Sequence, residues 1–161
     1  MSSCTVGNEF LCNHSLFGGL THEELELLRP RLKESRYTAG AYLLEQGEPN
    51  SSVFFIIEGS VAIIKHALDA VDADREIAVL STGDSFGEME LIDIQPCAAS
   101  VKALTDTTVA TFTNRDLYEL SHSHLKTYTM IIMNLAREIS RRLRVTDEKL
   151  AAELYRKPVK H

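Results

Sequence analysis

The chain has 161 residues, of which 44% are hydrophobic and 25% are charged, and its net charge is −6. These values are typical of one soluble globular domain that is large enough to bury a sizeable core. The acidic balance argues against a protein whose surface binds the phosphates of nucleic acid.

The N-terminal stretch MSSCTVGNEFLCNHS has neither the basic region nor the continuous apolar region of a signal peptide. No apolar run reaches the length of a membrane span, so we expect no membrane association. The three cysteines, Cys4, Cys12 and Cys97, form no even disulfide framework and no C-x-x-C pair. The sequence therefore predicts a reduced, cytoplasmic protein that consists of a single domain, residues 1–161.

Helical signals occupy residues 14–34. Thr21 and Glu24 have the spacing of a capping box, and leucines follow at helical spacing. Pro30 is expected to end or kink this helix near Arg29, because proline lacks the backbone N–H that a helix needs. A short apolar patch at the start of the segment is expected to dock it on the core: Leu16, Phe17 and Leu20.

Residues 35–113 have a different pattern of residue types. Short runs rich in Val, Ile, Phe and Thr alternate with turn signals that contain Gly, Pro, Asn and Asp. This pattern predicts many short strands in an antiparallel sandwich, jelly roll or barrel. A mobile loop is expected from Ala67 to Arg75, because the acidic stretch ALDAVDADR has little to bury.

Residues 114–157 are predicted to be helical. A short helix in DLYELSHSH precedes a long periodic segment from about Leu125 to Tyr155. Alternating steps of four and three residues mark an a/d seam, which charged residues flank. We interpret this seam as the contact of a parallel homodimer, and packing against the chain's own sheet is the alternative. The seam comprises Ile132, Ala136, Ile139, Leu143, Thr146 and Leu150.

The stretch SFGEMELIDIQPCAASV, residues 85–101, has the features of a loop that holds an anion. Gly87 allows the backbone to approach a ligand closely, and the residues after it are expected to begin a single helical turn. Free N–H groups at the start of such a turn favour a negative charge. Pro96 ends the helical piece, and the small residues after Cys97 leave room for a bound molecule.

Two stretches, AGAYLLEQGEPNSSVFFIIEGSVAI and SFGEMELIDIQPCAASVKAL, resemble the cyclic-nucleotide-binding domain of the bacterial catabolite activator and anaerobic regulator superfamily. The resemblance covers the chain from Leu16 to about Leu154. It implies an α+β fold in which an antiparallel jelly roll, or double-stranded β-helix, of about eight strands follows an N-terminal helix. A long C-terminal dimerisation helix completes this fold.

The resemblance also implies roles for individual residues. Glu88 matches the glutamate that accepts a hydrogen bond from the ribose 2′-hydroxyl, and the N–H of Ala98 is expected to meet the cyclic phosphate. Thr146 matches a threonine that touches the purine, although a lone threonine in a seam also sets helix register. The expected ligand-binding residues are Phe86, Gly87, Glu88, Met89, Cys97, Ala98, Ala99 and Thr146.

Cys97 departs from the family pattern, which has an arginine that pairs with the phosphate. Loss of one partner of a buried charge pair costs about 3–5 kcal/mol, so phosphate binding is expected to be weak. Glu90 stands where the family has a small residue, and its carboxylate can occupy the positive field of the helical turn. Lys102, Lys65 and Arg75 are candidates for a substitute cation.

Two functions remain open. The chain is either a sensor of cyclic AMP, cyclic GMP or a less anionic ligand, or a degenerate fold that dimerises and binds a partner protein without a small ligand. In the sensor, the ligand shifts a hinge near Arg115–Leu125, and a protein partner reads the change in the dimer helix. A Cys97 thiolate is a weaker hypothesis than a small buried thiol, and three cysteines are too few for an iron–sulfur cluster.

No catalytic motif is present, and no metal site is predicted. His122 and His124 are two residues apart at a helix end, without a further ligand at metal-binding spacing. The chain ends at YRKPVKH, before the helix-turn-helix domain that the family's transcription factors carry. We therefore expect no enzymatic activity and no DNA binding by this chain alone. Two alternatives stay open: the chain is complete, or it is part of a longer regulator whose DNA-binding half lies outside this sequence.

Overall fold

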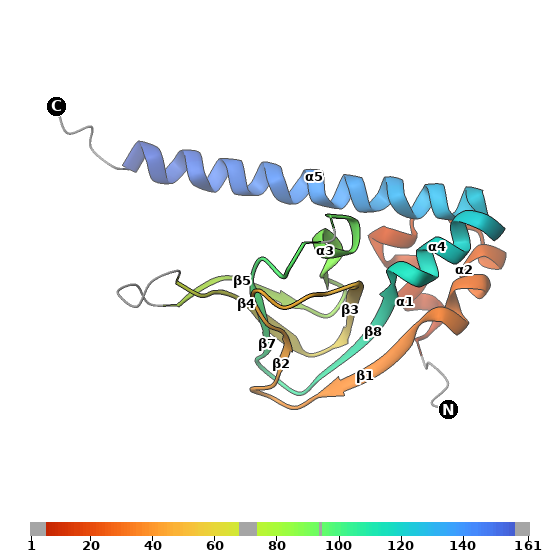
Figure 1. Cartoon of the computed structure of the whole chain (residues 1–161), viewed down its shortest axis with the longest axis horizontal. Coiled ribbons are helices and arrows are strands. Elements are labelled where there is room, and N and C mark those ends of the chain that lie inside the picture. The colour runs from red at the N-terminus through yellow and green to blue at the C-terminus, as the bar shows by residue number, and fades with distance from the viewer. Residues whose placement is uncertain (1–5, 68–73, 94, 157–161) are drawn as a thin grey trace.

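The structure of the protein is a computed structural model that describes residues 6–67, 74–93 and 95–156. A β-roll lies below a long C-terminal helix, and shorter helices cover one end of the roll (Figure 1). The loop expected from Ala67 to Arg75 lies largely outside the described residues. The predicted α+β fold class is confirmed.

Among the described residues, eight antiparallel strands form two four-stranded sheets, as the resemblance to the family implied. The strands run β1-β8-β3-β6 across one sheet and β2-β7-β4-β5 across the other. This arrangement brings β6 and β7, the strands on either side of residues 87–99, into different sheets. The strands are β1 (Lys33–Tyr37), β2 (Tyr42–Leu44), β3 (Ser52–Glu58), β4 (Ser60–Lys65), β5 (Arg75–Ser81), β6 (Ser85–Phe86), β7 (Ser100–Ala103) and β8 (Thr107–Thr113).

Strand β3 is buried on both faces, which explains its continuous apolar run, VFFII. Phe54 and Ile56 point into the roll, where they pack with residues of both sheets. Val53 and Phe55 point the other way, into a second core beneath the helices. Successive side chains of a strand point to opposite faces, so one strand contributes to both cores.

The N-terminal segment contains α1 (Asn8–Asn13), the 3₁₀ turn η1 (Ser15–Phe17), α2 (His22–Leu28) and the 3₁₀ turn η2 (Arg29–Arg31). The capping box of Thr21 and Glu24 is confirmed, and so is the end of regular helix near Arg29. Helix α1 was not predicted, because six residues are too short for a periodic signal. Its Leu11 is fully buried in the core beneath the helices.

Two helices follow β8, as predicted: α4 (Asn114–Ser123) and α5 (Leu125–Arg156). The first half of α5 lies over the N-terminal helices, and the second half continues past them (Figure 1). Asn134 anchors the first half, because its amide donates to the carbonyls of Leu16 and Gly18, both at 2.9 Å. None of the described helices combines the length and the apolar character that crossing a membrane requires.

The seam predicted for α5 does not lie on one uniform surface. Its first member, Ile132, is partly buried against the chain's own core, and Ile139 is also half-buried. Leu143 and Leu150 are 58% and 57% exposed. The first part of the seam therefore follows the alternative interpretation, packing within the chain, while the later part remains open to another surface. Its remaining members are exposed: Ala136 and Thr146.

Candidate ligand-binding site

The segment between β6 and β7 contains the short helix α3 (Glu88–Asp93), which confirms the predicted helical turn. Gly87 precedes this helix with φ +81°, a conformation that favours glycine. A Cβ at Gly87 would lie 2.6 Å from the carbonyl oxygen of Ser52 and 3.0 Å from the side-chain nitrogen of Asn50. The close approach of the backbone that Gly87 permits is thus to the start of β3.

The expected ligand-binding residues of this segment lie at different depths. Phe86 is buried in the roll, where it stacks on Phe54 with ring centroids 4.9 Å apart. Met89 is 55% exposed, so its side chain is not part of a buried wall. Ala98 is exposed and Ala99 is half-buried. Of these residues, the side chains of Phe86, Glu88 and Cys97 are buried, whereas those of Met89 and Ala98 are exposed.

Glu88 has a buried side chain, 3% exposed, and its partner is Arg142 on α5. The Arg142 guanidinium donates to Glu88 Oε1 at 2.5 Å and also to the carbonyl of Ser85. Burial raises the pKa of the Glu88 carboxyl, and the nearby positive charge of Arg142 opposes that rise. Glu88 Oε2 is buried without a hydrogen-bond partner among the described residues.

Cys97 is buried, 3% exposed, and its backbone is tied to the turn that follows β2. Its N–H donates to the carbonyl of Glu48 at 2.8 Å, and its carbonyl accepts from Gly47 at 2.9 Å. Burial raises the pKa of the Cys97 thiol, and the negative charges of Glu90 and Glu48 raise it further. Cys97 is therefore a neutral, enclosed thiol, which agrees with the simpler of the two interpretations of this residue.

Glu90 interacts with the N–H group that was expected to meet a phosphate. Its Oε1 accepts from the backbone N–H of Ala98 at 3.2 Å. The carbonyl of Ala98 in turn accepts a hydrogen bond from the ammonium group of Lys65, at the end of β4. A carboxylate and an ammonium group thus both contact the backbone next to Cys97.

The other candidate cations have different surroundings. Lys102 lies over the ring of Tyr42, with its ammonium nitrogen 5.4 Å from the ring centroid. Arg75 begins β5 and is exposed. Lys65 is therefore the candidate that contacts the cassette, residues 85–101.

The hydroxyl of Thr146 donates to the carbonyl of Arg142 within α5, at 2.9 Å.

Ser100, at the end of the cassette, lies in a network that has the order of a hydrolytic triad. His66 Nε2 is 2.7 Å from Ser100 Oγ, and His66 Nδ1 is 2.9 Å from Asp74 Oδ2. Ser100 is only 1% exposed, however, and its hydroxyl accepts the backbone N–H of Gln46 at 2.9 Å. A substrate has no access to the buried hydroxyl. The network instead ties the end of the cassette to Gln46 and His66, which follow β2 and β4.

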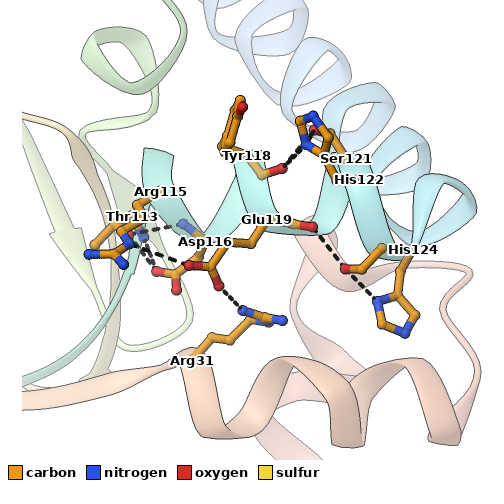
Figure 2. A network of polar contacts seen from close by, with 10 residues as sticks. Arg31, Thr113, Arg115, Asp116, Tyr118, Glu119, Ser121, His122 and His124 are labelled. Atoms are coloured by element: carbon orange, nitrogen blue, oxygen red, sulfur yellow. Dashed lines mark hydrogen bonds and ion pairs between the residues drawn. The ribbon is translucent and has the colours of Figure 1, made fainter.

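The region expected to act as a hinge contains a second polar network (Figure 2). A capping box between Thr113 and Asp116 fixes the start of α4. Arg31 of η2 donates to Glu119 at 2.8 Å and so ties α4 to the N-terminal segment. A single residue, His124, separates α4 from α5, and its φ of −143° and ψ of 64° are not helical.

Metal and cysteine chemistry has little support in this structure. Within residues 6–67, 74–93 and 95–156, no group of three or more His, Cys, Asp or Glu side chains is placed to hold a metal ion. Cys12 is exposed on α1, whereas Cys97 is buried in the roll. Cys4 lies outside the described residues. His122 is exposed on α4, and its Nδ1 lies 2.9 Å from the carbonyl of Tyr118.

Comparison with known proteins agrees with the roll and its cassette. Residues 34–124, which include every described strand apart from the first residue of β1, match the family described as the cyclic nucleotide-binding domain. The chain belongs to this family. The cyclic AMP receptor protein of Thermus thermophilus is 30% identical over 135 residues, which are 84% of this chain and 60% of that protein. The chain thus spans less than two thirds of that relative.

Solved structures of cyclic nucleotide-binding domains share the fold. A domain from Methylobacillus flagellatus has a TM-score of 0.81 and 26% identity, and covers 90% of this chain and 80% of its own. The regulatory subunit of a cAMP-independent protein kinase A from Trypanosoma cruzi, bound to guanosine, has a TM-score of 0.67 and 26% identity, with coverages of 80% and 43%.

A related regulatory subunit from Trypanosoma brucei has a TM-score of 0.68 and 25% identity, and covers 81% of this chain and 44% of its own. It is a variant bound to cAMP. A glutamate in it is changed to alanine, a threonine seven positions later to arginine, and the next residue, a valine, to alanine.

Arg142 is the residue of the site that the sequence analysis missed. It was assigned to the charged flank of the seam, among several arginines with the same spacing pattern. A weak signal was present, because Arg142 lies one helical turn before Thr146, which the family resemblance places near the ligand. Its pairing with Glu88 depends on how α5 crosses the roll, and periodicity does not report that.

Proposed function

We propose that this domain is a regulatory sensor whose pocket binds a small nucleotide-like ligand and passes the event to α5. The contact between Glu88 and Arg142 is the observation that carries this proposal. It joins the cassette directly to α5. The cassette residue of this contact, Glu88, is the one that the family resemblance assigns to the ribose. A ligand that engages Glu88 therefore acts on the residue that also holds the helix.

The proposed signal begins at the Glu88 carboxylate. A ribose hydroxyl that donates to Glu88 reduces the negative charge available to Arg142, so the guanidinium contact weakens or rearranges. Helix α5 is then free to change its angle at His124, the break between α4 and α5. The Arg31–Glu119 contact keeps α4 fixed while α5 moves. A ligand shifts this equilibrium only by its differential affinity for the two states.

We also propose that the later half of α5 forms a parallel homodimer. Leu143, Leu150 and Leu154 are 58%, 57% and 63% exposed, and they lie at coiled-coil spacing. A ligand-driven change in α5 then alters the relation between two copies, and a partner protein reads it. The members proposed for this contact are Ala136, Ile139, Leu143, Thr146 and Leu150, with Ile132 at its partly buried start.

The similar proteins suggest two classes of ligand for this pocket, cyclic nucleotides and nucleosides. The relative from Thermus thermophilus is a cyclic AMP receptor, whereas the subunit from Trypanosoma cruzi is bound to guanosine. The cAMP-bound Trypanosoma brucei variant gained an arginine seven positions after a lost glutamate. Glu90 and Cys97 of this chain are also seven positions apart, with the glutamate first. Both cyclic nucleotides and nucleosides are therefore ligand classes to test.

The test is isothermal titration of the protein with cyclic AMP and cyclic GMP beside two variants, Cys97→Arg and Lys65→Met. Cys97→Arg is expected to bind cyclic AMP at least about tenfold more tightly, because it supplies a partner for the phosphate. If the natural protein binds a cyclic nucleotide through Lys65, the Lys65→Met variant loses that binding. Hydrogen exchange of α5 in the bound state then measures whether the helix responds.

The alternative function is a scaffold that dimerises without a small ligand, and the neutral thiol at Cys97 favours it. Failure of the natural protein and of Cys97→Arg to bind any nucleotide or nucleoside would support the scaffold. Binding without any change in the hydrogen exchange of α5 would retain the pocket and reject the proposed signal.

A further inference from the structure

The first turn of α3 contains two acidic residues, Glu88 and Glu90. Glu88 Oε2 is buried and lacks a hydrogen-bond partner among the described residues, while the other oxygen pairs with Arg142, so a ligand can donate to this carboxylate only in a state in which the Arg142 contact has opened. Glu90 is held in place by the N–H of Ala98. A carboxylate accepts several hydrogen bonds, so this single bond orients Glu90 without using its acceptor capacity.

The surroundings of Cys97 are unfavourable to an anion. Burial raises the pKa of the thiol, which is therefore neutral, and the carboxylates of Glu90 and Glu48 add negative charge nearby. Lys65 brings one positive charge to the same edge, but its side chain is exposed and it donates to the Ala98 carbonyl. An exposed ammonium group is a screened point charge and does not replace a buried, bidentate guanidinium.

Hydroxyl groups suit this arrangement better than a phosphate does. A nucleoside offers donors at the 2′, 3′ and 5′ positions of its ribose, whereas a cyclic nucleotide retains only the 2′-hydroxyl and adds a negative charge. Once the Arg142 contact has opened, as the sensor function requires, Glu88 can accept from one ribose hydroxyl, and Glu90 can accept from another. Hydrogen bonds to an ionised carboxylate are stronger than neutral ones, so the two glutamates would favour a ligand that donates.

We propose, on the basis of the sensor function above, that the pocket selects an uncharged ribonucleoside over the matching cyclic nucleotide. Glu88 and Glu90 hold the ribose hydroxyls, and the small neutral Cys97 leaves space where the family has an arginine. Glu90 therefore determines specificity: it accepts from a hydroxyl, and its charge repels a phosphate at the same place.

The experiment is isothermal titration of the full chain with guanosine and adenosine beside cyclic GMP and cyclic AMP, at fixed pH and ionic strength. We expect at least one nucleoside to bind about tenfold or more tightly than its cyclic nucleotide. In the double variant Glu90→Ala/Cys97→Arg, we expect this preference to reverse, because the repelling carboxylate is replaced by space and the thiol by a cation.

Glu90→Gln separates the charge of Glu90 from its shape. This variant keeps an oxygen that can accept from Ala98, and we expect about tenfold weaker nucleoside binding with a smaller penalty against the cyclic nucleotide. The matched control is Glu23→Gln, an exposed position on α2, and it is expected to bind as the natural protein does. Thermal melting followed by circular dichroism verifies that each variant is folded.

The other outcomes are distinguishable. Tighter binding of a cyclic nucleotide by the natural protein overturns the nucleoside inference and leaves the sensor function standing. The nucleoside inference is also overturned if the natural protein ignores nucleosides while the double variant binds cyclic AMP, since the pocket is then intact but takes another ligand. Absence of binding by every folded form overturns both the inference and the sensor function.

Discussion

Arg142 and Glu88 are 54 residues apart in the sequence, yet a guanidinium nitrogen of Arg142 lies 2.5 Å from Oε1 of Glu88. Glu88 is buried and Arg142 is 37% exposed, so the pair lies at the boundary between the cassette and solvent. The Nε of Arg142 also lies 3.5 Å from Glu138, one turn earlier on α5. This relationship is a direct contact between the cassette and α5.

Arg142→Ala is expected to destabilise the protein by about 2–3 kcal/mol, because it leaves Glu88 buried without its countercharge. The value is below that of a fully buried pair because Arg142 is partly exposed. Glu88→Gln/Arg142→Ala is expected to recover part of the loss, since the buried charge is also removed. Urea unfolding of both variants and of Glu88→Gln measures the coupling. Additive effects of the two single changes would show that the contact does not stabilise the fold.

Gly87 and Gly83 both have positive φ, +81° and +92°, but only Gly87 is crowded. Gly83→Ala is expected to cost about 1 kcal/mol from backbone strain, because nothing lies within 4 Å of the added Cβ. Gly87→Ala is expected to cost roughly 3 kcal/mol or more, since strain is joined by a clash with the Ser52 carbonyl. Denaturant titration compares the two variants. Equal losses would mean that the cassette yields around the added methyl group.

His14 is buried among the aromatic rings of Phe10, Phe17 and Phe55, and its Nδ1 accepts from the N–H of Leu16 at 3.2 Å. Burial lowers the pKa of His14 below its usual value of 6.5. The unfolded chain therefore takes up a proton at a pH where the folded protein does not. The stability that His14 contributes is complete above pH 6.5 and is lost as the pH falls from 6.5 through the folded pKa.

His14→Asn is expected to flatten this dependence, because asparagine keeps an acceptor for Leu16 but does not titrate. The difference in slope is expected to be at most about 1.4 kcal/mol per pH unit within the window. Urea unfolding of both proteins between pH 5 and pH 8 is the measurement. Parallel curves for the two proteins would exclude His14 as the source of acid sensitivity.

Leu143→Glu and Leu150→Glu are expected to weaken the proposed homodimer, because each places a charge in the apolar seam of α5. Both residues are exposed within one chain, so the fold of the monomer is expected to survive. Sedimentation velocity over a range of protein concentrations measures the dissociation. Ile77→Glu, at a 54% exposed position on β5, is the control and is expected to leave association unchanged. A natural protein that sediments as a monomer at every concentration would contradict the proposed dimer.

Local patterns in the sequence determined most of the elements. The capping box at Thr21 and Glu24, the helix end near Pro30 and the helical turn after Gly87 were all predicted, because each depends on residues a few positions apart. Short apolar runs between turn signals predicted many short strands, and the resemblance to the family implied that there are about eight. The long helix α5 was predicted from its periodicity, and its boundaries differ from the expected ones by one residue at most.

Tertiary structure decided the contacts of the candidate site. The sequence placed Arg142 on a charged flank and Glu90 in a helical turn, but not the partners of either side chain. Arg142 reaches Glu88 because α5 crosses beside α3, and Glu90 reaches Ala98 because the chain folds back after Pro96. Helix α1 formed for the same kind of reason, since Leu11 is buried by residues distant in sequence. Periodicity and capping report interactions within a turn or two of the chain, whereas these contacts depend on how whole elements pack.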